Sequence, residues 1–227
     1  MNLDFSDDQK FLQDEARKFF DKEGGLTNTR KVMDESLSHD EALWGKVLEL
    51  GWTGIRIPEE YDGLGLGHLE LCVIAEEIGR ALAPIPFSSS VYLFTETIIK
   101  YGSEEIKKNV LPKLVTGEIV GTYAVAEDMS AITESTLSCA VEGDSVTGAK
   151  IAVPDAELAT HAVVLVKGAK GPELRLVGLN SDGVEISLQK NLDKSRSFYK
   201  VAFNNAQSSL LGEQGSGWES HVHIMDQ

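Results

Sequence analysis

The sequence predicts an α+β fold, in which an N-terminal all-α helical domain precedes a small β-barrel or β-sandwich domain. Two observations carry this prediction. Up to residue 118, apolar residues recur at the three- and four-residue spacing of amphipathic helices. From Val120 onward, they alternate with polar residues in short runs separated by Gly, Asp, Asn or Pro. We therefore expect domains at residues 1–118 and 119–212.

Five helices are expected in the first domain. Ser6 with Gln9, and Ser38 with Glu41, have the spacing of a capping box, which predicts a helix start at each place. Ser103 is the expected N-cap of the last helix, because two acidic residues follow it in the first turn. The predicted helices cover about residues 4–20, 41–50, 71–82, 92–101 and 104–114.

Short strands are expected in the second domain. Apolar residues alternate from Leu137 to Val141, and Gly143-Asp144 is typical of a hairpin turn into the next strand, Val146 to Val153. The remaining predicted strands are His161 to Val166, Leu174 to Leu179, Val184 to Leu188 and Phe198 to Phe203.

Composition and charge exclude several classes of function. The formal net charge of −15 argues against nucleic acid and against an anionic membrane as partners, since both attract clustered Lys and Arg. No apolar run approaches the ~20 residues of a membrane span, and the acidic N-terminus does not read as a secretory signal. Cys72 and Cys139 have no partner at metal-ligand spacing, which favours a reduced, cytoplasmic protein.

Several apolar and charged residues have structural interpretations. Trp44, Trp52, Leu64 and Leu66 are expected to pack in the core of the helical domain. Glu76 and Glu77 are adjacent on a predicted helix, so their side chains point about 100° apart. This favours a solvated face or an ion pair between helices over a pair of acid-base groups.

Four segments in order resemble the acyl-CoA dehydrogenase family: Gly51 to Glu77, Gly117 to Glu127, Gly148 to Lys150, and Leu211 to Trp218. The resemblance covers nearly the whole chain. It implies an α domain, a β domain and a second α domain that together enclose FAD, with an acyl-CoA thioester against the flavin. The implied reaction is α,β-dehydrogenation, in which the flavin supplies the redox chemistry.

The family carries its catalytic base on that second α domain. Here, residues 213–227 read only as its beginning, so we expect the C-terminal helical bundle of the family to be missing. The resemblance therefore implies no catalytic residue in this sequence, and the chain alone is predicted to be inactive. His221 and His223 lack acidic partners at useful spacing, and no metal site is expected.

The resemblance also implies a set of cofactor-binding residues. Tyr123, Val125 and Ala126 match the strand that lies along the flavin, but Ala126 replaces a hydroxyl-bearing residue. Ser130 falls in the turn that faces the pyrophosphate in the family, where this sequence has no glycine and begins with Asp128.

Two further flavin-facing positions differ from the family pattern. Ala152 takes the place of an aromatic residue, and Pro154 takes the place of a Thr or Ser. Pro154 has no N–H to donate, and Ala152 removes a large contact area. Together with Ala126, these changes weaken the predicted FAD site.

Three functions remain open. The first is an FAD-dependent acyl-CoA dehydrogenase that lacks its catalytic-base domain and passes electrons to an electron-transferring flavoprotein or a similar acceptor. The second is a partner subunit with a degenerate flavin site, working beside a complete paralogue in a hetero-oligomer. The third is an acyl-CoA binding module without redox function. The resemblance implies an acyl-CoA ligand, a role in lipid metabolism and a homo- or hetero-oligomer.

Overall fold

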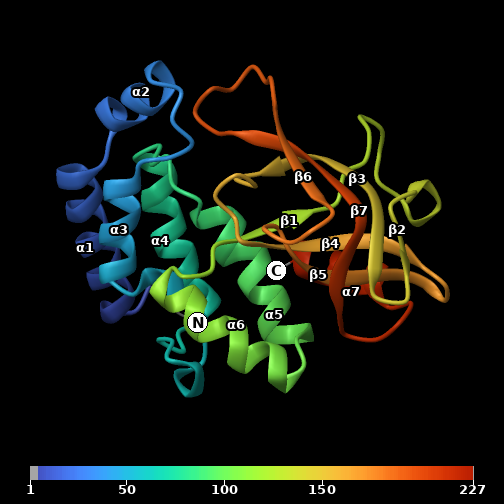
Figure 1. The fold of residues 1–227 in the computed structure, drawn as a ribbon. Coiled ribbons are helices and arrows are strands. Elements are labelled where there is room, and N and C mark those ends of the chain that lie inside the picture. Colours follow the sequence, from blue (N-terminus) through green and yellow to red (C-terminus); the bar gives the residue numbers. More distant parts are fainter. Residues whose placement is uncertain (1–4, 227) are drawn as a thin grey trace.

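The computed structural model describes residues 5–226 and confirms the α+β fold. Figure 1 shows helices α1 to α6 on one side of the molecule and the strands on the other, with the last helix, α7 (Gly217–Met225), beside the strands. Helix α6 ends at Thr116 and strand β1 begins at Gly121. The predicted domain boundaries at residues 118 and 212 stay predictions.

The first helix, α1 (Asp7–Glu23), begins with the predicted capping box. The Ser6 hydroxyl accepts from the Gln9 N–H at 3.2 Å, and the Ser6 N–H donates to Gln9 Oε1 at 3.0 Å. A second helix, α2 (Leu26–Asp34), was not predicted. It is a short helix that buries Thr29 and Val32, and it begins directly after Gly24 and Gly25, which end the first helix.

Helix α3 (Glu41–Glu49) has Asp40 as its N-cap, and the capping box predicted for Ser38 and Glu41 is wrong. The Leu43 N–H donates to Asp40 Oδ1 at 3.0 Å, whereas the Ser38 hydroxyl lies 3.2 Å from His39 Nδ1. The Asp40 carboxylate is a stronger acceptor than the Ser38 hydroxyl, because hydrogen bonds to a charged group are stronger than those to a neutral one.

Helix α4 (His68–Arg80) is joined to α1 by an ion-pair network around Glu77. The Glu77 side chain is fully buried, and its carboxylate accepts from Arg17 Nη2 at 2.7 Å and from Arg80 Nε at 2.6 Å. These hydrogen bonds, led by that from Arg17, lower the pKa of Glu77. The interpretation of this residue as part of an interhelical ion pair is confirmed.

The next helical segment is longer than predicted. It begins as a π-helix, η3 (Ser88–Thr95), and continues as α5 (Glu96–Tyr101). Helix α6 (Glu104–Thr116) then starts at Ser103 as predicted, because the Ser103 hydroxyl accepts from the Ile106 N–H at 3.2 Å. Three 3₁₀ turns complete the helical elements: η1 (Trp52–Gly54), η2 (Glu59–Tyr61) and η4 (Glu134–Thr136).

The loop between η1 and α4 corrects one core prediction. Trp44 and Trp52 are buried as expected, but Leu64 and Leu66 remain 43% and 38% exposed. Their backbone N–H groups bond to Gly54 and Ile55, which fixes the loop against η1 with the leucine side chains toward solvent.

The strands of residues 5–226 form a closed barrel, as one of the two predicted β architectures. Hydrogen-bonded pairs run in a ring through β4, β2, β3, β7 and β5 back to β4, while β1 pairs in parallel with β4 and β6 pairs with β7. The strands are β1 (Gly121–Ala124), β2 (Ala140–Glu142), β3 (Ser145–Pro154), β4 (His161–Gly168), β5 (Gly171–Gly178), β6 (Val184–Gln189) and β7 (Phe198–Leu211).

The helices and the barrel share one apolar core. Phe94 and Ile98 of η3 and α5 pack in the same cluster as Tyr123 of β1 and Leu211 of β7. A second cluster fills the barrel interior, where Ala124, Val164 and Val201 lie. Alternate residues of β1 and β4 thus face the helices and the barrel interior in turn.

Residues 5–226 contain neither a candidate membrane span nor a candidate metal cluster. No helix between residues 5 and 226 is both long and apolar enough to cross a membrane. Over the same residues, no group of three or more His, Cys, Asp or Glu side chains could hold a metal ion. Cys72 is exposed, Cys139 is buried, and both are free thiols.

Candidate functional site

The predicted cofactor-facing residues lie where the end of β1 runs beside β3. The Ile151 N–H donates to the Ala126 carbonyl at 2.8 Å, and Lys150 Nζ donates to the Val125 carbonyl at 3.0 Å. The structure therefore brings Val125 and Ala126 next to the β3 segment that contains Ala152. The carbonyls of both residues are already engaged within the protein.

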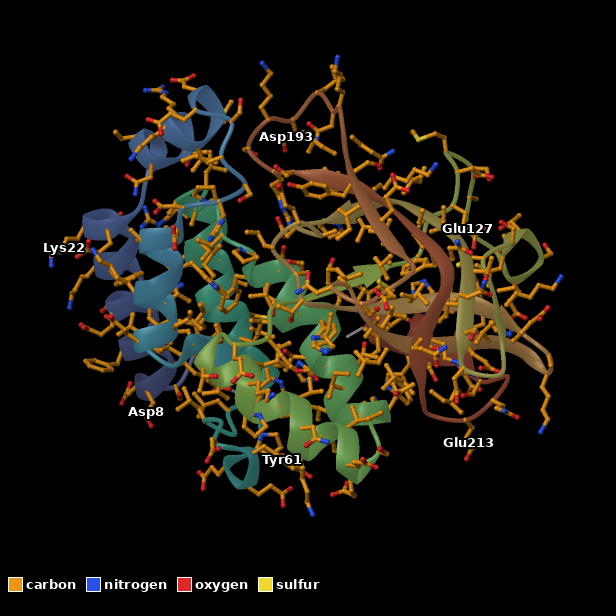
Figure 2. All side chains as sticks on the ribbon, viewed as in Figure 1. Asp8, Lys22, Tyr61, Glu127, Asp193 and Glu213 are labelled. Atoms are coloured by element: carbon orange, nitrogen blue, oxygen red, sulfur yellow. The ribbon has the colours of Figure 1, made fainter. Side chains whose placement is uncertain are left out.

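A buried ion pair supports this segment. Lys150 Nζ lies 2.7 Å from Glu127 Oε1, and the Lys150 side chain is fully buried. Glu127, labelled in Figure 2, also accepts from the Ser138 N–H at 2.7 Å and the Cys139 N–H at 3.0 Å. Burial favours the protonated carboxyl, but the hydrogen bonds from Lys150 and Ser138 outweigh it and lower the pKa of Glu127.

This ion pair was not found from the sequence. Glu127 and Lys150 lie on segments that only the barrel brings together. Both belong to the segments that resemble the family, but the resemblance does not imply a contact between them. A lysine inside a predicted strand was the available signal, because Lys is almost never fully buried without a partner.

Tyr123 points toward α7 rather than toward open space. Its side chain is buried, its hydroxyl lies 3.2 Å from His221 Nδ1, and the two rings stack at 5.8 Å with an interplanar angle of 21°. Burial raises the pKa of Tyr123 and lowers the pKa of His221. Trp218 packs on the same histidine with ring centroids 5.7 Å apart.

Ser130 lies in the loop after this segment and bonds to its own turn. Asp128 Oδ1 accepts from the Ser130 N–H at 2.7 Å and from the Ser130 hydroxyl as well. These bonds lower the pKa of Asp128, so its carboxylate stays charged at neutral pH. The space bordered by Val125, Asp128 and Ser130 is only about 10 Å³.

Ala152 and Pro154 occupy the second half of β3. Ala152 has a left-handed φ of 51°, and its N–H donates to Gln189 Oε1 at 2.7 Å. The Pro154 carbonyl accepts from the Thr122 hydroxyl at 2.6 Å. Both backbone groups therefore bond within the barrel.

Several groups that the resemblance places against FAD already have partners within the protein. At the turn, a dianionic pyrophosphate would meet the charged Asp128 carboxylate, and both donors of Ser130 already bond to that carboxylate. Ala126 offers no hydroxyl, and the Ala152 N–H is taken by Gln189. Each flavin polar atom that loses such a donor and stays buried without a partner costs about 1–3 kcal/mol of binding free energy.

The chain belongs to the acyl-CoA dehydrogenase family. Residues 6–118 match the model of the N-terminal domain of acyl-CoA dehydrogenases. The mitochondrial isovaleryl-CoA dehydrogenase of Solanum tuberosum is 29% identical over 95% of this chain and 56% of the relative. The chain thus spans just over half the length of the curated relatives it matches.

Solved structures agree with this membership. An acyl-CoA dehydrogenase from Bacillus anthracis, solved in complex with FAD, is 26% identical with a TM-score of 0.86, over 98% of this chain and 41% of that one. A structure reported for the electron transferring flavoprotein of Acidaminococcus fermentans has a TM-score of 0.87 at 24% identity, over 100% of this chain and 63% of that one, and shows the fold alone.

Proposed function

We propose that this chain acts in the α,β-dehydrogenation of an acyl-CoA thioester as a partner subunit that leaves FAD to a complete paralogue. Family membership supports the reaction class. The observation that carries the partner role is the Asp128–Ser130 turn, where one carboxylate holds both donors of the serine.

The second candidate is an FAD-dependent acyl-CoA dehydrogenase that uses its own flavin site together with a further domain. One observation favours it: the fold of the FAD-bound Bacillus anthracis enzyme matches 98% of this chain. Flavin bound by this chain would then have to displace Ser130 from Asp128, at the cost of about two hydrogen bonds to a charged group.

The colour of the purified protein tests the two candidates. We expect colourless protein, with well under one flavin released per chain on denaturation, that supports acyl-CoA oxidation only after mixing with a flavin-containing paralogue. Yellow protein whose flavin absorbance bleaches on adding an acyl-CoA would establish the second candidate. Binding of the thioester without turnover in either preparation would leave only a non-redox acyl-CoA binding module.

We also propose that an electron-transferring flavoprotein docks on this chain and accepts the electrons from the flavin of the paralogue. Leu50, Leu64 and Leu66 form an exposed apolar surface, here called the leucine patch, with exposed fractions of 45%, 43% and 38%. Leu64 lies against Gly51, next to Leu50. A cluster of exposed apolar side chains on an otherwise acidic protein favours a protein–protein contact.

Replacing Leu64 by Glu should weaken binding of the acceptor flavoprotein to this chain by about 10-fold or more, because a charge in the centre of an apolar contact must be desolvated. Surface plasmon resonance with immobilised chain measures the change in Kd. Leu188→Glu is the matched control, since Leu188 is 68% exposed on the barrel, away from the patch. Equal affinities of the two variants would remove the leucine patch as the docking site.

A further inference from the structure

A cavity of about 220 Å³ lies between helix α4, the π-helix η3 and the loop between β6 and β7. Asp193 lies on that loop and is labelled in Figure 2. The cavity shares no residue with the predicted cofactor-binding set. One side of it is apolar, while Ser88 and Ser195 also line the cavity. The apolar side is formed by Ala75, Ile78, Leu82, Ala83 and Ile85.

One end of the cavity is polar. Arg196 Nη2 bonds to Asp155 Oδ2 at 3.2 Å, while its Nε and Nη1 donate to no residue in the described part of the chain. Tyr92 also lines the cavity, and its hydroxyl forms no hydrogen bond with any residue between 5 and 226. Phe87 packs edge-on against the Tyr92 ring at 5.6 Å and fixes its position.

The Tyr92 hydroxyl is a donor under physiological conditions. Burial raises the pKa of Tyr92 to about 12, so the hydroxyl keeps its proton. The cavity end thus presents a permanently charged guanidinium and a neutral O–H, which both donate hydrogen bonds. Such a pair is suited to a carboxylate, whose two oxygens accept without donating.

Gly79 keeps the cavity open. It lies inside α4, where glycine costs up to about 1 kcal/mol relative to alanine. A Cβ added at Gly79 would meet no atom within 4 Å, so no close backbone contact requires glycine at this position. A side chain here would instead extend into the space that the apolar wall encloses.

We propose that this cavity binds a small carboxylate that carries a compact hydrocarbon group. The carboxylate accepts from Arg196 and Tyr92, and the hydrocarbon packs on Ile78, Leu82 and Ile85. The volume suits a chain or ring of about six carbons, since a cavity of ~150 Å³ already holds benzene. This site stands independently of the proposed function, because it uses none of the residues expected to bind the flavin.

Calorimetric titration of the full chain with hexanoate tests the proposal. We expect saturable binding of hexanoate and much weaker binding of hexanol, which lacks the charge. Arg196→Met should weaken hexanoate binding by about 10-fold or more, because it removes hydrogen bonds from a charged donor. Tyr92→Phe should weaken it by several-fold, and it keeps the proposal testable if Arg196→Met fails to fold.

A cavity-filling variant separates this site from nonspecific binding. Gly79→Leu should abolish saturable binding of hexanoate without loss of thermal stability. Gly45→Leu is the matched control, because Gly45 also lies inside a helix with nothing within 4 Å of an added Cβ, but lines no part of this cavity. Hexanoate binding that survives in Gly79→Leu, equal affinity for hexanol, or no saturable binding to the native chain would overturn the proposal.

Discussion

Replacing Glu127 by Gln should lower the free energy of unfolding by about 3–5 kcal/mol, because removing one partner of a buried ion pair leaves the other charge uncompensated. The Lys150 side chain is fully buried, and its ammonium group would lose its anionic partner. It would keep the hydrogen bond to the Val125 carbonyl, 3.0 Å away. Urea unfolding followed by circular dichroism measures the change.

The control for this variant is Glu142→Gln, an exposed strand residue expected to stay within about 0.5 kcal/mol of the native protein. The double variant Glu127→Gln/Lys150→Met should recover much of the loss, since it removes both charges. In the native protein, the Glu127 contribution is complete above the ordinary pKa of about 4.3 and is lost as pH falls through the lowered folded value. Equal stability of Glu127→Gln and Glu142→Gln would contradict a structural role for the ion pair.

Replacing Phe94 by Ala should cost about 3–5 kcal/mol of folding free energy, as is usual for a buried phenylalanine. Phe94 is fully buried in the core shared by helices and barrel. Thermal and urea unfolding measure the loss, and Phe11→Ala is the control, because Phe11 is 67% exposed. Similar stabilities of these two variants would show that the shared core is not what holds helices and barrel together.

Gly121 provides the matched partner for Phe94. A Cβ added at Gly121 would lie 2.1 Å from Phe94 Cγ, so Gly121→Ala should cost about 1–3 kcal/mol through overpacking. The double variant Phe94→Ala/Gly121→Ala should be less destabilised than the sum of the two single variants, because the smaller side chain at 94 makes room for the new methyl. Strict additivity would mean that the two residues do not contact each other.

Local signals in the sequence were sufficient for several elements. The capping box at Ser6, the N-cap at Ser103 and the hairpin turn at Gly143-Asp144 depend only on neighbouring residues, and all are present. The N-cap of α3 was misplaced because Ser38 and Asp40 are both good caps, and only the fold decides between them. Asp40 also accepts from Asn28 of α2 at 2.6 Å, a contact that sequence spacing does not encode.

The features of the candidate site that could not be predicted from the sequence depend on contacts between residues far apart in the chain. The family pattern identified Ala126, Ala152 and Pro154 as altered positions, but their backbone partners come from segments that are distant in sequence. For example, the Ala152 N–H donates to the side chain of Gln189, which lies at the end of β6. Leu64 and Leu66 were expected to be buried because apolar residues usually are, yet a loop fixed through its backbone can expose them.

The apolar cluster that joins Ile57 and Phe94 to Leu211 has a consequence during synthesis on the ribosome. Helices α1 to α6 emerge first, but the cluster that contains Phe94 and Ile98 also contains Leu174 and Leu211, which emerge much later. The apolar surface of the first half of the chain therefore stays uncovered until β7 has been synthesised, and uncovered apolar surface favours aggregation before folding is complete.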